Sequence, residues 1–380
     1  MLISFLIFLP LIGSLIIFIS KDFKFYRFFA LVISMFNFFL SLFFWILFDK
    51  SSGYFQFCEI YNWNYFNILL GIDGLSLFFI ILTTFLIAFC ILYNWNNILN
   101  FKSYVIYFFF IESLLILFFT SLNLLIFFIV FESLLIPLFL LIGVFGSGRR
   151  KVRSGYFFFF YTLVSSILFL FSIIYIYLLT GTFNYLILIS LKFENNIQFY
   201  LWLGFFFAFA SKIPIFPFHL WLPEAHVEAP TGGSVLLAGI LLKLGTYGVI
   251  RFLIPLFKDA SFFFLPLIFL LCIISIIYAS GTAIRQSDIK RVIAYTSIAH
   301  MNLVILGSFS FNLLGFAGSI FQMLSHGIVS SALFFCIGVL YSKFHTRLID
   351  DFGGLVQLAP KFSIFFFYFY FSKYGVSLHI

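Results

Sequence analysis

Long apolar runs recur along almost the whole chain, and few polar residues interrupt them. Each run is close to the roughly 20 residues that an α-helix needs to cross the hydrocarbon core of a bilayer. The pattern predicts an all-α polytopic membrane protein with about twelve transmembrane helices. The predicted spans are residues 2–20, 28–48, 71–93, 103–119, 123–145, 155–180, 198–222, 233–257, 261–282, 290–309, 311–342 and, as the weakest of them, 361–372.

One predicted span contains Lys212, Pro214 and Pro217 in the stretch FASKIPIFP. Neither proline has an N–H, so we expect the carbonyls of Ala210 and Ile213 to lack helical partners and the helix to break. The negative end of a half-helix would then lie beside Lys212 and lower the cost of a charge in the membrane. The alternative is a short surface loop between two apolar runs.

Composition agrees with a membrane protein, because 64% of the residues are hydrophobic and 9% are charged. If every span crosses, most Lys and Arg residues fall in the loops after odd-numbered spans, here called the odd loops. By the positive-inside rule the odd loops face the cytoplasm or matrix, and the N-terminus faces the opposite side. The odd-loop residues are Lys21, Lys24, Arg27, Lys102, Arg149, Arg150, Lys151, Arg153, Arg285, Lys290, Arg291, Lys343, Arg347 and Lys361.

Ionisable groups inside predicted spans cost about 2.5–3.5 kcal/mol each and therefore indicate ion pathways or buried partners. Glu132 lies near the middle of its span, and Pro137 is expected to bend that helix. Lys243 lies at mid-span among glycines. His300 and His326 lie among hydroxyl side chains, where an imidazole can both donate and accept protons. For each of these groups a purely structural polar contact is the alternative.

Glu112 and His219 are weaker candidates for a proton path, and we expect Asp73 to cap the start of its helix. The segment HLWLPEAHVEAPTGG invites a metal site because it holds two His and two Glu residues. It lacks the HExxH spacing, and we predict a solvated loop and no metal. The four cysteines have no cluster spacing, and no nucleotide or nucleophile motif is present.

Five segments resemble one family of membrane subunits. They are GIDGLSLFF, FESLLIPLF, SKIPIFPFHLWLPEAHVEAPTGGSVLLAGILLKLGTYG, IAYTSIAHMNLV and MLSHGIVSSALFF. Together they are similar to the chain 4 family of mitochondrial NADH:ubiquinone oxidoreductase, the antiporter-like proton-pumping subunits of respiratory complex I. The likeness covers residues 1–367, and the block 211–248 is its most specific part.

The resemblance implies a membrane-arm subunit with two inverted helical repeats, each containing a broken helix. It implies N-terminal helices over 1–102, a first repeat over 103–257 and an incomplete second repeat over 258–380. It further implies the mitochondrial inner membrane with the N-terminus on the intermembrane-space side, or, as an alternative, a bacterial plasma membrane. The implied partners are the other membrane-arm subunits, including neighbouring antiporter-like chains, and no nucleic acid.

Residue roles also follow from the resemblance. Glu132 and Lys212 match a glutamate and a lysine that carry protons in the first repeat, and Lys243 matches the lysine that links the half-channels. His300 and His326 match relay histidines. NADH, FMN, iron–sulfur clusters and ubiquinone are expected in sister subunits, so this chain would serve proton translocation without redox chemistry of its own.

The chain departs from the family pattern after PKFSIFFFYFYF. The family continues there into a second broken helix with a glutamate. We expect a separate polypeptide to supply this part, or a gene break or frame change near residues 368–372 to have ended the chain early. Two other functions stay open at this point: a subunit of a related cation/proton antiporter or membrane-bound hydrogenase, and a structural membrane subunit that transports nothing.

Overall fold

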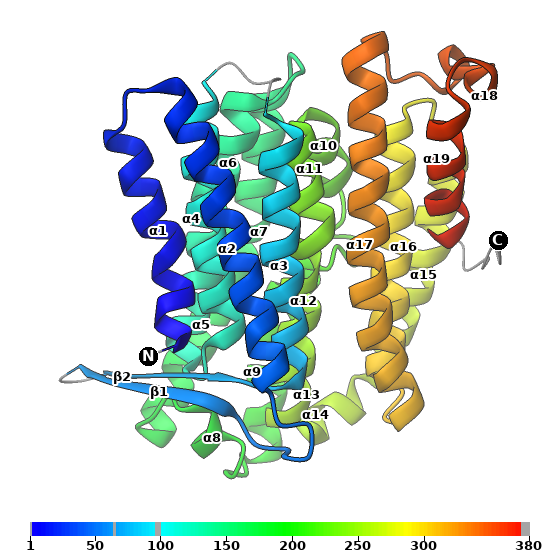
Figure 1. The fold of residues 1–380 in the computed structure, drawn as a ribbon. Coiled ribbons are helices and arrows are strands. Elements are labelled where there is room, and N and C mark those ends of the chain that lie inside the picture. The colour runs from blue at the N-terminus through cyan, green and yellow to red at the C-terminus, as the bar shows by residue number, and fades with distance from the viewer. Residues whose placement is uncertain (1, 64–65, 96–99, 374–380) are drawn as a thin grey trace.

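The structure, a computed structural model, describes residues 2–63, 66–95 and 100–373. Ten helices in these ranges are long and apolar enough to cross a membrane, and they stand side by side in a bundle (Figure 1). Of the other two predicted spans, 198–222 is divided between two helices and 361–372 forms one short helix. The first four helices are α1 (Leu2–Ile19), α2 (Phe23–Leu47), α3 (Gly74–Tyr93) and α4 (Phe101–Thr120).

A β-hairpin that the hydropathy pattern did not predict precedes α3. Its antiparallel strands are β1 (Gln56–Trp63) and β2 (Phe66–Ile72), and it lies at the end of the bundle where α1 begins (Figure 1). The Glu59 carboxylate accepts hydrogen bonds from the backbone N–H groups of Ile3 at 2.8 Å and Ser4 at 3.1 Å. The hairpin therefore caps the positive end of α1 with a negative charge.

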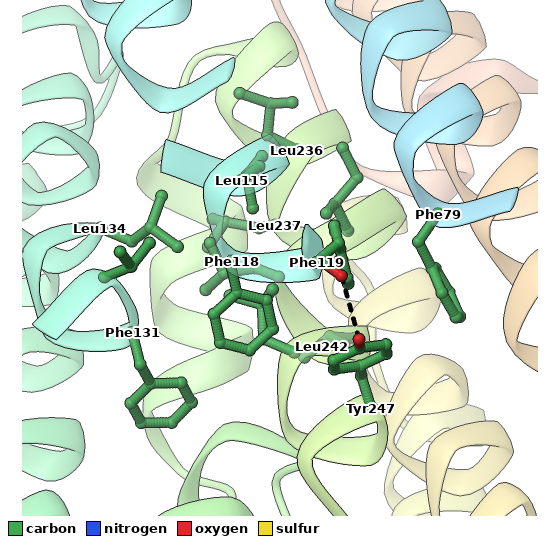
Figure 2. Close-up of a cluster of buried hydrophobic side chains, with 14 of the residues drawn as sticks. Phe79, Leu115, Phe118, Phe119, Phe131, Leu134, Leu236, Leu237, Leu242 and Tyr247 are labelled. Atoms are coloured by element: carbon green, nitrogen blue, oxygen red, sulfur yellow. Dashed lines mark hydrogen bonds between the residues drawn. The ribbon is translucent and has the colours of Figure 1, made fainter. Parts of the chain in front are cut away.

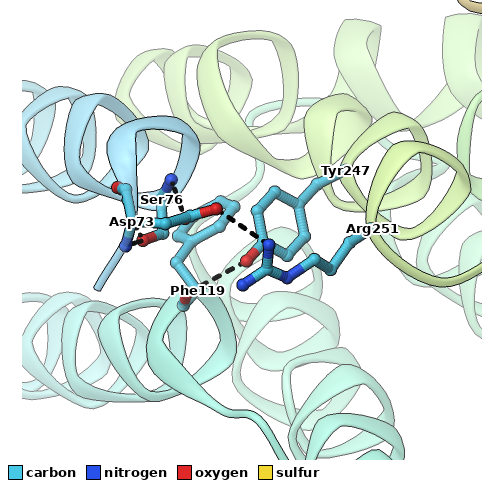
Figure 3. Close-up of polar contacts among 5 residues, drawn as sticks. All are labelled: Asp73, Ser76, Phe119, Tyr247 and Arg251. Carbon is cyan, nitrogen blue, oxygen red and sulfur yellow. Dashed lines mark hydrogen bonds and ion pairs between the residues drawn. The ribbon is translucent and has the colours of Figure 1, made fainter. Parts of the chain in front are cut away.

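Asp73 caps the start of α3, as predicted. Its carboxylate accepts a hydrogen bond from the N–H of Ser76 at 2.9 Å, and its own N–H donates to the Ser76 hydroxyl at 2.9 Å. Its second oxygen pairs with Nη1 of Arg251 at 2.8 Å (Figure 3). Tyr247, one turn before Arg251, donates to the carbonyl of Phe119 at 3.1 Å. These contacts join the helix that contains Arg251 to α3 and α4.

The helix that carries Glu132 is interrupted, as the proline predicted. A turn at Leu134 separates α5 (Leu124–Ser133) from α6 (Leu135–Phe145). Pro137 lies in the first turn of α6 and has no N–H to offer the carbonyl of Ser133. The elements that follow are α7 (Lys151–Thr180) and α8 (Tyr185–Leu188).

The predicted break at Lys212 is present, since α9 (Asn195–Lys212) ends at the lysine and α10 (Trp221–Glu228) begins after a short irregular segment. The prediction that the carbonyl of Ala210 lacks a partner is wrong. The N–H of Ile215 donates to it at 2.9 Å. The chain turns tightly after the lysine, so this later N–H takes the place of the one that Pro214 lacks.

The central helix of the bundle covers residues 231–256, and its most apolar stretch is completely buried. Leu236, Leu237 and Leu242 lie in one apolar cluster with Phe118 and Phe119 of α4 (Figure 2). Its parts are α11 (Thr231–Leu236), the π-helical η1 (Leu237–Leu241), α12 (Leu242–Gly248), the π-helical η2 (Val249–Leu253) and α13 (Ile254–Leu256).

The C-terminal helices pack beside this centre, with α16 between α15 and α17. Nζ of Lys102 donates to the carbonyl of Phe18 at 2.7 Å, and Nη2 of Arg347 donates to the Ser147 hydroxyl at 2.6 Å, so these odd-loop ends of the helices lie together. The elements are α14 (Lys258–Phe263), α15 (Leu265–Ile284), α16 (Ile289–Ser308), α17 (Leu313–Phe344), the short 3-10 helix η3 (Ile349–Phe352), α18 (Leu355–Leu358) and α19 (Pro360–Lys373).

Candidate functional site

Lys212 is fully buried at the end of α9. Within the described ranges its Nζ atom has no hydrogen-bond partner. It lies 4.6 Å from the ring centroid of Phe131 and 5.7 Å from that of Phe158. Aromatic faces attract a cation, but they do not replace the hydrogen bonds that an ammonium makes in water. In the part of the chain that the structure describes, the lysine is therefore held in place without a direct counter-ion.

Glu132, on the last turn of α5, is the acidic side chain that acts electrostatically on Lys212. No direct ion pair joins them in the part of the chain that the structure describes, since Nζ of Lys212 has no polar partner there. Glu132 is half-buried, and the Ser166 hydroxyl is among the groups that act electrostatically on it. Its Oε1 atom is buried and has no partner among the described residues. Within the described ranges, the charges of Glu132 and Lys212 therefore interact without a direct ion pair between the two side chains.

Lys243 is fully buried on α12, in the middle of the central helix. Its Nζ atom donates to the carbonyl of Ala238 and lies 2.9 Å from Nδ1 of His326 on α17. An ammonium can only donate, so a charged Lys243 requires an unprotonated Nδ1 on His326. The neutral imidazole then carries its proton on Nε2, an atom that has no partner within the described residues.

His300 on α16 faces the same histidine. The rings of His300 and His326 have centroids 5.8 Å apart, and the Gln322 amide lies 3.3 Å from Nδ1 of His300. Lys243, His326 and His300 therefore form a continuous row from the central helix to α16. The structure brings these three predicted residues together, and it brings Lys212 and Glu132 together as a second group.

The two weaker candidates lie apart from this row. Glu112 is fully buried on α4, where its Oε1 accepts a hydrogen bond from the Asn37 amide at 2.6 Å. His219 follows the break after α9 and is 3% exposed. Its ring lies between those of Phe216 and Tyr278, with centroids 5.6 and 5.1 Å away. Both nitrogens of His219 lack partners among the residues described.

The prediction that HLWLPEAHVEAPTGG forms a solvated loop is wrong. Most of it is α10, which packs against α7 and α16. Trp221, Leu222, Ala225 and His226 have no exposed surface, and Glu228 is 8% exposed. The spacing of Trp221 and Ala225 is that of one helical face, a signal that could have predicted a buried helix. Across the described ranges, no group of three or more His, Cys, Asp or Glu residues could hold a metal ion.

The sequence analysis did not predict that two further lysines are buried. Lys290 is 3% exposed, and its Nζ donates to the carbonyl of Ala229 at 3.0 Å. Lys373 is 7% exposed, and its Nζ donates to the carbonyl of Ile293 at 3.0 Å and lies 3.4 Å from the Ser297 hydroxyl. The sequence placed the first in a loop and the second outside the spans, because each lies at a helix end. Residues 374–380, the end of the segment that departs from the family pattern, lie outside the described residues.

The arrangement of helices and buried charges has counterparts in known proteins. A family model for the transmembrane part of NADH:quinone oxidoreductases and Mrp antiporters matches residues 121–378. The chain belongs to this family. A chain 4 of NADH-ubiquinone oxidoreductase from Chondrus crispus is 52% identical over 372 residues, which cover 96% of this chain and 76% of that protein. The subunit M of Rickettsia prowazekii NADH-quinone oxidoreductase is 44% identical, over 99% of this chain and 78% of that protein.

Solved structures agree with this membership. A chain of respiratory complex I from Thermus thermophilus matches with a TM-score of 0.90 and 27% identity, over 99% of this chain and 79% of that one. A chain of an archaeal membrane-bound sulfane sulfur reductase matches with a TM-score of 0.88 and 23% identity, which shows a shared antiporter-family fold only. The predicted resemblance to chain 4 is confirmed. The division into two inverted repeats stays a prediction.

Proposed function

We propose that this chain passes protons along a row of buried side chains that begins at Glu132 and Lys212 and ends at His300. The chain is a proton-pumping membrane-arm subunit of NADH:ubiquinone oxidoreductase, or complex I, as its relatives and fold indicate. The observation that carries the relay is the fully buried Lys212, which lacks any direct partner within the described ranges. A structural lysine would be expected to have its charge compensated by contact.

The first group acts as a switch in this proposal. A carboxylate on Glu132 favours the ammonium form of Lys212. When that carboxylate is neutralised, the ammonium loses this electrostatic stabilisation. The proton of Lys212 can then leave. To move one proton against the membrane potential, the swing in interaction energy must exceed about 2.3 kcal/mol per 100 mV. Because Glu132 and Lys212 form no direct ion pair in the described part of the chain, a change in the charge of Glu132 can change their interaction energy without first breaking a hydrogen bond.

The second group passes the proton on. Lys243 gives a proton to Nδ1 of His326, so that an N–H bond on the lysine breaks and one on the imidazole forms. His326 then releases its Nε2 proton toward His300. After this step Lys243 is neutral and His326 carries its proton on Nδ1. Once the imidazole has returned to the tautomer protonated on Nε2, Lys243 can accept the next proton, which Lys212 supplies through water. Lys243, the first member of the second group, thus receives each proton that the first group releases.

We further propose that the chain lies in the mitochondrial inner membrane with its odd loops in the matrix. The excess of Lys and Arg in those loops supports this orientation. NADH, FMN, iron–sulfur clusters and ubiquinone would reside in sister subunits. Electron transfer there would change the charge next to this chain and so reach Glu132. A cation/proton antiporter is the second candidate, because the matching family includes such proteins.

The test is Lys212→Ala in the assembled complex. Alanine removes the titrating group and costs less in the membrane than lysine, so assembly should persist. We expect fewer protons translocated per NADH oxidised, measured in sealed vesicles. Lys192→Ala, which removes an exposed lysine from the loop before α9, is the matched control and should change nothing. A normal proton-to-electron ratio in assembled Lys212→Ala complex would exclude Lys212 from the path and favour a structural subunit.

A further inference from the structure

A cavity opens among the odd-loop ends of the helices. Its volume is about 500 Å³. It lies where α3, α6 and α17 end and where α11 and α16 begin. Polar side chains in its wall include Tyr93, Asn94, Ser147, Thr231, Lys290 and His345. None of these residues belongs to the relay described above, although Thr231 is the first residue of the central helix.

Lys290 forms the inner wall of this cavity. Its Nζ atom donates to the carbonyl of Ala229 at 3.0 Å and to the Ser234 hydroxyl at 3.4 Å. The Asp288 carboxylate accepts a hydrogen bond from the backbone N–H of Lys290 at 2.8 Å and thereby fixes the first turn of α16. The charged groups that act on the ammonium are Arg347, Asp288 and Glu228.

His226 lies behind Lys290, on α10, with no exposed surface. Both of its ring nitrogens lack partners within the described residues. The ring stacks on Phe334 of α17 with centroids 4.8 Å apart, and its backbone carbonyl accepts a hydrogen bond from Ser234 at 3.1 Å. Lys290, Lys373 and Lys243 all act electrostatically on this imidazole. Ser234 contacts both Nζ of Lys290 and the backbone of His226, so this histidine lies close to the cavity wall.

We propose that protons enter the relay through this cavity, and that Lys290 hands them by way of His226 to Lys243. The proposal rests on the proposed function, and it adds an uptake route from the odd-loop side. In the transfer an N–H bond of the Lys290 ammonium breaks and an N–H bond on His226 forms. The neutral Lys290 then takes a proton from water in the cavity, so no charge accumulates. Both nitrogens of the buried His226 lack partners among the residues described, so one can accept a proton while the other releases one.

The chemistry of the α10 terminus distinguishes a proton carrier from a helix cap. Nη1 of Arg347 donates to the carbonyl of Val227 at 2.6 Å, and the N–H of Ser147 donates to that of Glu228 at 3.2 Å. An arginine is sufficient to cap the carbonyls of a helix end, and it does not lose its proton in proteins. At the carbonyl nearest the cavity the chain instead has Lys290, a group that can release one.

The decisive variant is Lys290→Arg in the assembled complex. Arginine keeps the charge and can still donate to the carbonyl of Ala229, but it cannot pass on its proton. We expect a several-fold lower rate of proton translocation with normal levels of assembled complex. Lys102→Arg is the matched control, because Lys102 also donates to two helix-end carbonyls on the same side, at 2.7 and 2.8 Å, yet lies outside the cavity. Translocation at the wild-type rate in Lys290→Arg would overturn the proposal and leave a structural cap.

A second measurement covers the case in which Lys290→Arg does not assemble. Ser342 is exposed at the cavity mouth, and Ser103 lies on the same side outside it. Ser342→Cys and Ser103→Cys complexes would be treated, after assembly, with a membrane-impermeant charged thiol reagent. Modification should slow translocation only in Ser342→Cys, and equal rates in both labelled complexes would refute uptake through the cavity. Lys243→Ala, measured in parallel, distinguishes failure of the relay from failure of the uptake route. If it blocks translocation while the cavity variants do not, the relay stands and only this uptake route fails.

Discussion

The ion pair between Asp73 and Arg251 should be a main anchor of the central helix. Its side chains are 22% and 10% exposed, and its atoms are 2.8 Å apart. Removing one partner of a buried pair costs about 3–5 kcal/mol, and the partial exposure places this pair near the lower value, about 3 kcal/mol. Asp73→Asn retains an oxygen that can accept from Ser76, so it isolates the loss of charge (Figure 3). Asp73→Ala also removes the helix cap, which adds about 1 kcal/mol.

The double variant Asp73→Asn with Arg251→Met tests whether the pair itself is responsible. It leaves no unpaired charge, so its destabilisation should be smaller than the sum of the two single changes. It still loses the contacts of the guanidinium with Phe55 and Tyr185, whose centroids lie 4.3 and 4.9 Å away. Each such contact contributes about 0.5–1 kcal/mol. We therefore expect the double variant to lie about 1–2 kcal/mol below wild type, on the scale of these contacts.

The assay is the free energy of unfolding of the purified chain in mixed micelles, titrated with SDS and followed by tryptophan fluorescence. Asp22→Ala is the matched control, because Asp22 caps α2 through the N–H of Lys24 at 3.2 Å. It should cost about 1 kcal/mol or less. If Asp73→Asn unfolds like wild type, or if the single and double changes simply add, then the ion pair does not anchor the helix.

Two further predictions concern packing and topology. A Cβ on Gly245 would lie 3.0 Å from the backbone oxygen of Phe209, so Gly245→Ala should push α12 from the end of α9 and cost about 1–3 kcal/mol in the same titration. Gly281→Ala, a helix position with open space, should be neutral or stabilising, and equal effects would contradict this reasoning. Single cysteines in the loops 21–27, 146–153 and 285–291 should all react with an impermeant thiol reagent from the matrix side. Labelling of 146–153 and 285–291 from opposite sides would refute the proposed orientation.

Hydropathy predicted the long helices because each must supply its own backbone hydrogen bonds in lipid, which fixes its length and composition. The break at Lys212 was predictable for a similar reason, since two prolines remove donors at fixed positions. The hairpin over 56–72 was not predictable in this way. It is apolar enough to merge with the neighbouring run, and its role depends on Glu59 reaching the start of α1, a contact across 55 or more residues.

Hydropathy did not predict which residues near helix ends are buried. Hydropathy assigns Lys290 to a loop because it stands next to Asp288 and Arg291, yet it lies against the end of α10. His226 was placed in a loop because prolines flank it, although the short helix between them fills a gap in the bundle. The burial of both residues depends on which helix packs against them, and the local pattern of apolar and polar residues does not contain that information.

Three of the buried lysines donate to a backbone carbonyl, which helps to explain how a membrane bundle can hold several cations with few acids. Lys243 donates to the carbonyl of Ala238, Lys290 to that of Ala229 and Lys373 to that of Ile293. A carboxylate partner would stabilise each ammonium more strongly, but it would become an unpaired buried charge when the proton left, at a cost of several kcal/mol. A carbonyl is neutral, so releasing the proton leaves two neutral groups. Carbonyl contacts at helix ends and π-helical turns therefore suit lysines that must lose and regain protons, whereas Arg251, which keeps its charge, is paired with an acid.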